Sequence, residues 1–383
     1  MSFPLPDFHS FLLYSFLFLF LFSAIVQFCY WSFLFSRLAF YKTPTKFLQK
    51  NKRDEQPVSV IICAHNEAEN LEKNLPRILN QNYRSFEVIV VNDNSTDNTE
   101  NVLLKYIKKY NNLRVINAGT KPSGMVGKKF PLKIGIESSK FETLLLTDAD
   151  CSPSSFDWLY CMQRRITDTT EIALGYGPYA PKPNLLNRFI RFETIYTAIQ
   201  YFSFALAGES YMGVGRNLAY RKKLFSKTDG FTKHKHIASG DDDLFINEAA
   251  TRENVDIVLE KETFVFSEAK TTWRDYYRQK TRHLSTARSY RLKHQILLGL
   301  LSFSHFFFYF GGIMLIILKF SIIFVGTVFV GRLLLLQFFY AHILKRFHNQ
   351  TLLVWVPLLD ALYILYYVTF TPNLFTGKKI TWK

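Results

Sequence analysis

A long run without charged residues, at positions 11–36, most limits what this chain can fold into. It reads FLLYSFLFLFLFSAIVQFCYWSFLFS and is mostly apolar over 26 positions. A backbone inside a bilayer must satisfy its own hydrogen bonds, and about 20 apolar residues of helix are enough to cross the hydrocarbon core. A cleavable signal peptide would be shorter and would follow basic residues, whereas no Lys or Arg precedes this run. The sequence therefore predicts a membrane anchor over residues 1–36.

The charges that flank this anchor predict its orientation. The residues before it contain no Lys or Arg, whereas the linker over 37–56 is strongly basic. Basic residues close to a span usually stay on the cytoplasmic side, so we expect the N-terminus outside and the middle of the chain in the cytoplasm. This predicts a multi-pass protein of the plasma membrane or the cell inner membrane. The basic residues of the linker are Arg37, Lys42, Lys46, Lys50, Lys52 and Arg53.

The C-terminal region, 295–383, contains further apolar stretches. Two of them, 296–318 and 320–344, have the length and composition of membrane spans. If they form a hairpin, Lys345 and Arg346 return to the cytoplasm, in agreement with the charge rule.

The last apolar stretch, 351–370, is harder to assign. Pro357 and Asp360 interrupt it, and three lysines follow it. A complete span would place those lysines outside, against the charge rule, so a re-entrant or interface-lying segment is favoured and a fourth span is the alternative. The three lysines are Lys378, Lys379 and Lys383.

Composition excludes some functions. The net charge is +16, and much of the basic excess lies beside the apolar spans, where it would meet anionic lipid headgroups. We expect no nucleic-acid partner, because no nucleic-acid-binding motif accompanies that charge. The four cysteines form no CxxC pair and are interpreted as reduced packing residues.

The middle of the chain, 57–268, predicts an α/β domain. Short apolar strands such as SVIICA and FEVIVV alternate with segments of helical periodicity. Such alternation predicts a mostly parallel sheet with right-handed crossovers. Ligands of these sheets bind at the carboxyl ends of the strands.

Two carboxylates follow one of these strands, in the stretch FETLLLTDADC. Asp148 and Asp150 are two positions apart, so in an extended chain they point to the same face. A divalent cation between them would offset their repulsion. The alternative is a solvated turn in which Asp150 caps a following helix.

Six short motifs, in order from Val58 to His283, resemble those of the membrane-bound family 2 inverting glycosyltransferases, including the ceramide-glucosyltransferase-like and cellulose-synthase-like relatives. The chain departs from the family pattern at Asn92 and Asn94, which replace an Asp and a Gly, and at His283, where the family has Trp. The motifs are SVIICAHNEAENL, VVNDNSTDNT, GKKFPLKIGI, TDADC, SGDDDLF and QKTRH.

This resemblance implies a glycosyltransferase A type fold, with N- and C-terminal transmembrane helices added, and a nucleotide-sugar donor, usually a UDP-sugar. By position, Asp93 would contact the nucleobase or ribose, with the backbone near Ala64 and the side chain of Glu67 assisting. Asp148 would lie near the ribose and metal, and Asp150 would bind Mg²⁺ or Mn²⁺. The remaining implied donor residues are Lys128 near the diphosphate, and Gln279 and Arg282, which would close over the nucleotide.

The motif SGDDDLF is expected to supply the general base. The acceptor hydroxyl must lose a proton as it attacks the sugar, so a carboxylate has to lie within hydrogen-bond reach. By the resemblance Asp241 is the base, with Asp242 as the second candidate and Asp243 beside them. The same acids would also suit a helix N-terminus, and both interpretations are compatible.

The segment 269–294 is predicted to be a basic amphipathic helix at the membrane interface, and it includes QKTRH. His283 in place of Trp, together with few spans, favours transfer of a single sugar to a lipid or lipid-linked acceptor. A processive polysaccharide synthase is one alternative. A non-catalytic membrane scaffold that keeps the fold is another.

Overall fold

The computed structural model describes residues 7–47 and 55–376. The chain forms two compact units, and each is described by itself. One consists of residues up to Tyr41 together with Arg291–Phe375, and the other consists of Lys42–Tyr290 together with the residues from Thr376 on. Six charged residues used in the orientation argument lie outside the described residues: Lys50, Lys52, Arg53, Lys378, Lys379 and Lys383.

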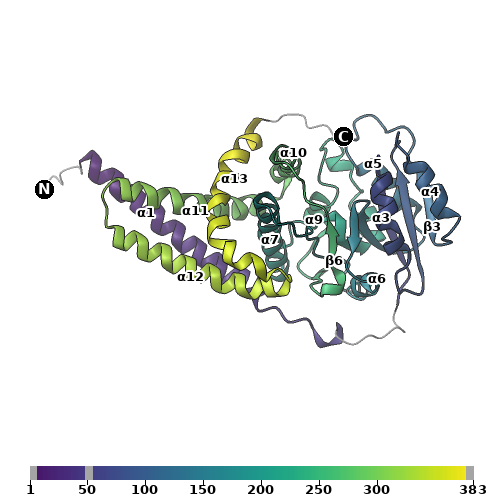
Figure 1. The fold of residues 1–383 in the computed structure, drawn as a ribbon, viewed down its shortest axis with the longest axis horizontal. Coiled ribbons are helices and arrows are strands. Elements are labelled where there is room, and N and C mark those ends of the chain that lie inside the picture. Colours follow the sequence, from purple (N-terminus) through teal and green to yellow (C-terminus); the bar gives the residue numbers. More distant parts are fainter. Residues whose placement is uncertain (1–6, 48–54, 377–383) are drawn as a thin grey trace. The chain divides into compact units, whose positions relative to one another are not determined.

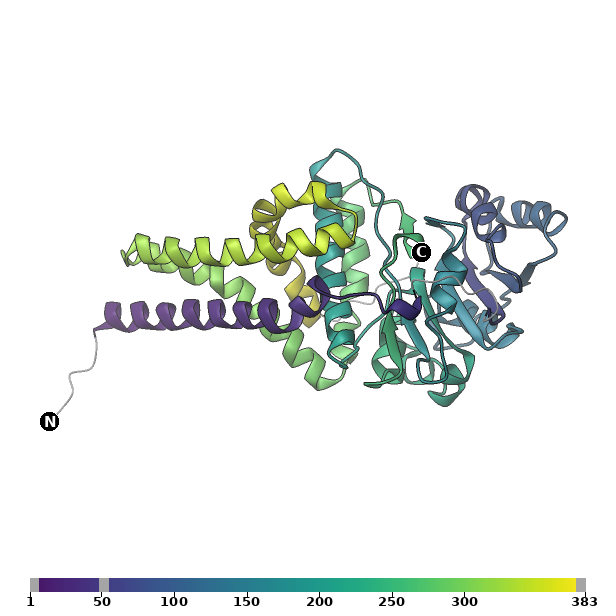
Figure 2. The same ribbon diagram turned by 90° about the horizontal axis from the view of Figure 1, so that it is seen from below.

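The first unit is entirely helical. Its N-terminal helix is capped by Asp7, whose carboxylate accepts a hydrogen bond from the Ser10 N–H at 2.8 Å. Figures 1 and 2 show α1, α11 and α12 running side by side. The elements are α1 (Phe8–Cys29), the π-helical turn η1 (Tyr30–Phe35), α2 (Ser36–Ala39), α11 (Leu292–Ile317), α12 (Ile322–Arg346), the 3₁₀ segment η8 (Gln350–Trp355) and α13 (Val356–Thr376).

Four helical segments in the described part of the chain are long and apolar enough to cross a membrane. Three correspond to the predicted anchor and hairpin, with ends shifted by a few residues. The segments are Phe8–Ala39, Leu292–Ile317, Ile322–Arg346 and Gln350–Pro372.

The fourth segment contains the stretch whose placement the sequence left open. Pro357 does not break α13, because it lies in the first turn, where a missing N–H leaves no intrahelical bond unmade. Asp360 is buried and ion-paired with Arg332 at 2.6 Å. In Figure 1, α13 crosses the direction of α1, α11 and α12. Length and composition permit a span, so the re-entrant or interface placement stays a prediction.

The second unit is built on a seven-stranded sheet of order β3-β2-β1-β4-β7-β6-β8. The four strands β3, β2, β1 and β4 are parallel, and β7 pairs antiparallel with β4, so the predicted mostly parallel sheet is confirmed. A separate two-stranded sheet pairs β5 with β9. The strands are β1 (Val58–Ala64), β2 (Phe86–Asn92), β3 (Leu113–Asn117), β4 (Thr143–Asp148), β5 (Cys151–Pro153), β6 (Ile172–Leu174), β7 (Leu218–Arg221), β8 (Val255–Ile257) and β9 (Val265–Ser267).

Helices cover both faces of this sheet, as the crossovers require. Leu75 of α3 and Leu103 of α4 pack with alternate residues of β1 and β2 on one face. Ile134 of α5 packs on Ile89 and Val91 on the other. The helices of this unit are α3 (Ala68–Leu79), α4 (Thr99–Ile107), α5 (Lys129–Ser138), α6 (Trp158–Gln163), α7 (Leu185–Leu206), α8 (Lys222–Lys227), α9 (Asp243–Ala249) and α10 (Trp273–Leu284).

The predicted interface helix over 269–294 is shorter in the structure. The helix α10 ends at Leu284, a single 3₁₀ turn follows at Ala287–Ser289, and α11 begins at Leu292. Thr286 and Tyr290 both donate side-chain hydrogen bonds to Asp243, at 2.5 and 2.6 Å. These bonds draw the chain out of the helical path, which helical periodicity alone did not predict.

Candidate functional site

The predicted site residues gather at the carboxyl edge of the parallel strands. In the register of the sheet, Ala64 of β1 lies beside Asn92 of β2, and Cys63 lies beside Asp148 of β4. Because parallel strands all end at one edge, the polar residues that follow each strand meet there. This convergence of strand ends was predicted from the alternation of strands and helices.

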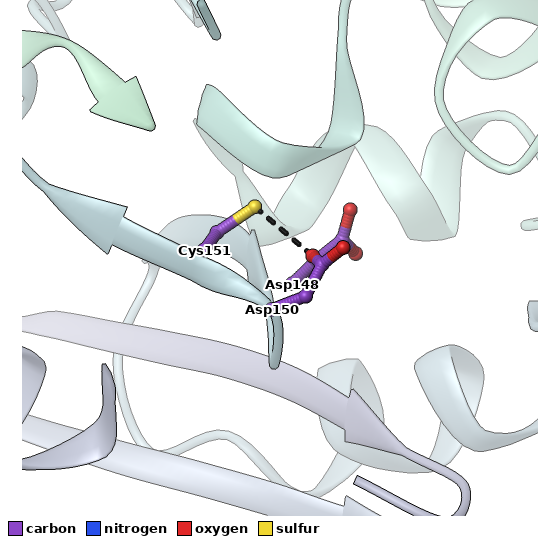
Figure 3. Close-up of side chains that lie close together, drawn as sticks. All are labelled: Asp148, Asp150 and Cys151. Carbon is purple, nitrogen blue, oxygen red and sulfur yellow. Dashed lines mark hydrogen bonds between the residues drawn. The ribbon is translucent and has the colours of Figure 1, made fainter. Parts of the chain in front are cut away.

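Two carboxylates and a thiol form the central group of the site. Oxygens of Asp148 and Asp150 and the Sγ of Cys151 all lie within 4.8 Å of one another (Figure 3). The Cys151 thiol donates a hydrogen bond to Asp150 Oδ1 at 3.3 Å. Among the described residues this is the only group of three such side chains close enough to hold a metal ion. Asp150 does not cap the following helix, because α6 begins after Asp157.

The donor set of this group fits a hard divalent cation. Carboxylate oxygens are the ligands that Mg²⁺ and Mn²⁺ prefer, and the two carboxylates are close enough to share one ion. Burial and the negative charge of Asp148 raise the pKa of Asp150, which is the repulsion that a bound cation would relieve. Cys151 is fully buried in the core, which agrees with its predicted packing role and makes it the weakest candidate ligand.

Lys128 supplies positive charge at the same place. Its ammonium donates a hydrogen bond to Asp148 Oδ1. Burial by itself would raise the pKa of Asp148, but the charge of Lys128, aided by Arg216 and Arg282, lowers it below its usual value. Asp148 is therefore ionised and available to a cation. The place of Lys128 near the donor diphosphate stays a prediction, and in the structure its ammonium bonds to one member of the acid pair formed by Asp148 and Asp150.

Asp93 lies at the end of β2, away from the acid pair. It is buried, and its N–H donates to the Ala64 carbonyl at 2.8 Å. The Lys121 ammonium lies 3.3 Å from Asp93 Oδ2 and donates to the Gly127 carbonyl at 2.9 Å. Lys121 was not among the predicted site residues, since an isolated lysine in a loop gives no motif.

Glu67 follows β1, and the negative charges of Asp148 and Asp150 act on its carboxyl. Burial raises the pKa of its carboxyl, and the charges of Asp150 and Asp148 add to this effect. Its Oε2 accepts a hydrogen bond from Asn70 at 2.6 Å. Glu67 therefore belongs to the same electrostatic environment as the acid pair.

The three consecutive aspartates have different surroundings. Asp242 Oδ2 accepts the Gly215 N–H at 2.6 Å, and burial together with the neighbouring aspartates raises its pKa to about 7. Asp243 is buried and accepts the hydroxyls of Thr286 and Tyr290. The carboxylate of Asp241 forms no hydrogen bond or ion pair with another residue of the described part of the chain. Its charge nevertheless acts on Lys128 and Cys63, which places it near the strand edge.

The helix α10 carries Gln279, Arg282 and His283, and it is held by α7. Lys280 forms an ion pair with Glu193 of α7 at 2.6 Å, with side chains only 12% and 3% exposed. The preceding residue, Gln279, has its amide nitrogen 3.4 Å from the hydroxyl of Tyr179. Arg282 lowers the pKa of Asp148, so α10 reaches the electrostatic field of the acid pair.

Arg216 is a second residue that sequence reasoning undervalued. Its guanidinium lies 4.5 Å from the centre of the Tyr179 ring and donates to the Gly177 carbonyl at 2.6 Å. Its charge contributes to the lowered pKa of Asp148 and opposes the rise in the pKa of Asp150. It lies in a glycine-containing stretch, GESYMGVGRNLAYRKKLF over 208–225, where the sequence alone is equally compatible with ordinary surface charge.

Comparisons with known proteins agree with the resemblance that the sequence motifs show. A family model described as glycosyl transferase family 2 matches residues 59–228, and one described as glycosyl transferase family group 2 matches residues 145–371, more than half of the chain. A probable glycosyltransferase of Bacillus subtilis is 26% identical over 288 residues, which is 70% of this chain and 66% of that protein.

Two further proteins are similar over different extents. A dolichyl-phosphate β-glucosyltransferase of Trichomonas vaginalis is 35% identical over 133 residues, 32% of this chain and 40% of that protein. The chain thus spans 66% of the length of the Bacillus subtilis protein and 40% of the length of the Trichomonas vaginalis protein. A mannosyltransferase structure from Pyrobaculum calidifontis, in complex with GDP-mannose and Mn²⁺, is 15% identical with a TM-score of 0.56, over 94% of this chain and 99% of that one. This last likeness concerns the fold.

Proposed function

Because the chain belongs to glycosyl transferase family 2, we propose that it is a membrane-bound inverting glycosyltransferase. It moves a sugar from a nucleotide-sugar donor, of which a UDP-sugar is the first choice, to a hydroxyl of a lipid or lipid-linked acceptor. The observation that carries this proposal is the convergence of Asp148, Asp150, Lys128 and Asp241 at one strand edge.

The acid pair is the proposed metal site. Asp148 and Asp150 would hold Mg²⁺ or Mn²⁺, and the bound cation would act as a Lewis acid on the donor diphosphate. Lys128 would change partner on donor binding, from the Asp148 carboxylate to a phosphate oxygen. Arg282 adds positive charge from α10, so the negative charge that develops on the leaving diphosphate meets cations in a partly buried site.

Asp241 is the proposed general base. Asp243 is fully occupied by two hydroxyls and a backbone N–H, and Asp242 accepts two backbone N–H groups. Asp241 has free carboxylate lone pairs, with which it can bind the hydroxyl of the lipid that receives the sugar. It takes the proton of this hydroxyl as the hydroxyl oxygen attacks the anomeric carbon. Direct attack with a single base inverts that carbon. The choice among the three aspartates therefore rests on which carboxylate the fold leaves unoccupied.

The remaining predicted residues are proposed to enclose the donor nucleotide. Asp93 with Lys121 at its side, and the backbone at Ala64, would contact the base and ribose. Gln279 and Arg282 would close over them from α10, whose position is fixed by the ion pair between Lys280 and Glu193.

A lipid-linked acceptor at a membrane is the proposed setting. Four helical segments of the described chain have the length and composition of spans, and one similar protein is named for transfer to dolichyl phosphate. By the positive-inside rule the catalytic domain, 57–268, would face the cytoplasm of an inner or plasma membrane. The anchor over 1–36, the linker over 37–56 and the membrane region over 295–383 complete the proposed organisation.

The test is transfer of radiolabelled sugar into chloroform-extractable lipid. Purified protein in detergent, with polyprenyl phosphate and native lipid extract as acceptors, is incubated with UDP-glucose, UDP-galactose, UDP-N-acetylglucosamine or GDP-mannose and Mn²⁺. We expect label in lipid from one of these donors, and a product of inverted anomeric configuration by NMR.

Two variants make this test specific. Asp241→Asn should lose at least 10²-fold in rate while it retains nucleotide binding, because only the proton acceptor is removed. The exposed Asp229 has a φ of 58°, which asparagine also adopts readily, so Asp229→Asn is the matched control and should act like wild type. Label only in insoluble polymer would support a processive synthase instead. Nucleotide binding without transfer from any donor would support a scaffold.

A further inference from the structure

The turn that precedes α5 lies against the segment that leads to the three aspartates. The Val126 N–H donates to the Lys235 carbonyl at 3.0 Å. Gly127, with a φ of 71°, lies so close to Ala238 that a Cβ added to Gly127 would lie 2.2 Å from the Ala238 carbonyl oxygen. Only a residue without a side chain permits this approach. Residues 126–127 are therefore in close backbone contact with residues 235–238.

Lys129 completes this contact from the first turn of α5. Its side chain is fully buried, and its ammonium donates hydrogen bonds to the carbonyl of Ile237 at 2.7 Å and to that of Ser239. A buried ammonium is costly unless it is paired, and these two carbonyls supply the partners. The neighbouring Lys128 bonds instead to Asp148. The two adjacent lysines thus bond to different parts of the chain, Lys128 to the end of β4 and Lys129 to the segment 237–239.

The charge of Lys129 also matches its surroundings. Asp241, Asp242 and Asp243 all act on it electrostatically, and burial lowers the pKa of its ammonium against their influence. Three carboxylates in succession repel one another, so one buried cation beneath them reduces the cost of keeping them together. Within the described chain, Lys129 is the one lysine or arginine hydrogen-bonded to the backbone of residues 237–239.

We propose that Lys129 is a positioning residue, which fixes the segment 237–241 so that Asp241 faces the Lys128–Asp148 pair. This inference rests on the proposed function, since it presumes that Asp241 is the base. One turn would then set both halves of the reaction: Lys128 addresses the leaving diphosphate, and Lys129 holds the segment that takes the proton from the acceptor.

A displaced base and a weakened donor site have different kinetic signatures. Loss of the ammonium leaves the carbonyls of Ile237 and Ser239 unpaired and frees the segment to shift. A shift of about 1 Å in a reacting group can cost on the order of 10²-fold in rate. The adjacent Lys128, which is proposed to bind the diphosphate, bonds to Asp148 and not to the segment held by Lys129, so nucleotide affinity should be preserved.

The experiment compares Lys129→Met and Lys129→Arg with Lys133→Met. Lys133 is on the same helix, partly exposed, and pairs only with Glu137 one turn later, so its removal is the matched control. For each protein we measure kcat, the KM for the donor and the Kd for UDP with Mn²⁺. We expect Lys129→Met to lose about 30- to 100-fold in kcat, with the Kd for UDP changed less than about 3-fold, and Lys129→Arg to recover at least about 5-fold.

Three outcomes would overturn the inference, and a fourth would instead refute the proposed function. Wild-type kcat in Lys129→Met would overturn it, and so would an equal loss of kcat and UDP affinity. If Lys129→Met does not fold, Lys129→Gln retains a donor of hydrogen bonds and should give a smaller loss of kcat with UDP affinity intact; an unchanged kcat in that variant would overturn the inference. Failure of wild type to transfer any sugar would refute the proposed function rather than the role of Lys129.

Discussion

Two ion pairs, one from each unit of the molecule, differ in how completely their carboxylates are hydrogen-bonded. In the α/β unit, Lys128 and Asp148 have side chains 16% and 38% exposed and are joined by a single hydrogen bond. In the helical unit, Arg332 and Asp360 are each 6% exposed. The first pair is open to an incoming ligand, and the second is closed.

In the closed pair, both oxygens of the Asp360 carboxylate are hydrogen-bonded, whereas Arg332 Nε has no hydrogen-bond partner among the described residues. Arg332 donates to both oxygens of Asp360, at 2.6 and 3.4 Å, and to Gln27 at 3.2 Å. Asp360 also accepts the Tyr309 hydroxyl at 2.7 Å and lies 3.2 Å from His305 Nε2. These residues come from α1, α11, α12 and α13, so one polar cluster joins the four long helices of the unit.

The contrast indicates how to separate a ligand site from a structural ion pair. A buried pair whose carboxylate oxygens are all engaged has no acceptor left for a substrate, and removal of one partner leaves an uncompensated charge. A pair that keeps free lone pairs beside other carboxylates is poised to exchange partners. Asp150 and Asp241 accompany the first pair and have no equivalent in the second.

The largest expected effect is removal of the cation from the open site. Chelation with EDTA should reduce transfer at least about 10²-fold, because the leaving diphosphate loses its Lewis acid. Added Mn²⁺ or Mg²⁺ should restore the rate, and Asp150→Ala should abolish that restoration. The readout is radiolabel transfer with melting temperature followed in parallel. A melting temperature that falls along with activity would mean that the open site is structural.

The second prediction concerns the closed site. Arg332→Leu should destabilise the helical unit by about 3–5 kcal/mol, because Asp360 is left buried without its cation. Thermal unfolding in detergent, followed by intrinsic fluorescence, measures this loss. The double variant Arg332→Leu/Asp360→Leu should recover most of it, since two apolar residues replace the pair.

The corresponding control in the open site is Lys128→Met, which should lower activity far more than stability. If Arg332→Leu instead leaves the melting temperature unchanged, or the double variant is no better than the single one, the cluster does not hold the helices together. The two variants together therefore test the distinction between an open and a closed pair.

A third, smaller effect is expected at the ion pair between Lys280 and Glu193. Glu193→Gln keeps the shape of the side chain but removes the charge that anchors α10 to α7. We expect the KM for the donor to rise about 3- to 10-fold, since Gln279 and Arg282 lose part of their positioning, a cost of about 1 kcal/mol. Initial rates over a range of donor concentration measure it. A change in kcat with constant KM would assign α10 to the acceptor side instead.

How far the sequence predicted this molecule depends on the type of signal. The parallel strands, the strand-end acids and the apolar helices follow from local patterns of period 2 and 3.6, and the structure confirms the sheet. Lys121 and Arg216 lie outside the quoted motifs, and Lys129 lies in one whose expected role fell to Lys128; the partners Asp93, Ser239 and Gly177 are distant in the sequence. No local pattern marks such residues.

The break after Leu284 was missed for the same reason. The segment 269–294 has helical periodicity, but Thr286 and Tyr290 bond to Asp243, more than 40 residues earlier in the chain. Likewise, Asp360 interrupts an apolar stretch, and only the fold reveals Arg332 as its partner. Tertiary contacts of this kind override local preference.

The smallest expected effect is a pH dependence at Asp242, which is intermediate between the open and closed cases. Its pKa is raised to about 7 from 3.8, so the folded unit holds a proton that the unfolded chain releases at lower pH. The contribution of Asp242 to stability is therefore complete below about pH 4 and is lost as the pH rises through about 7. In Asp242→Asn the fall in melting temperature between pH 5 and pH 8 should be smaller by about 2–4 °C. Asp229→Asn, which alters an exposed carboxyl, should leave the wild-type slope. Parallel curves for Asp242→Asn and wild type would mean that Asp242 is ionised in the folded protein, which would make it as open as Asp241 and reinstate it as a candidate base.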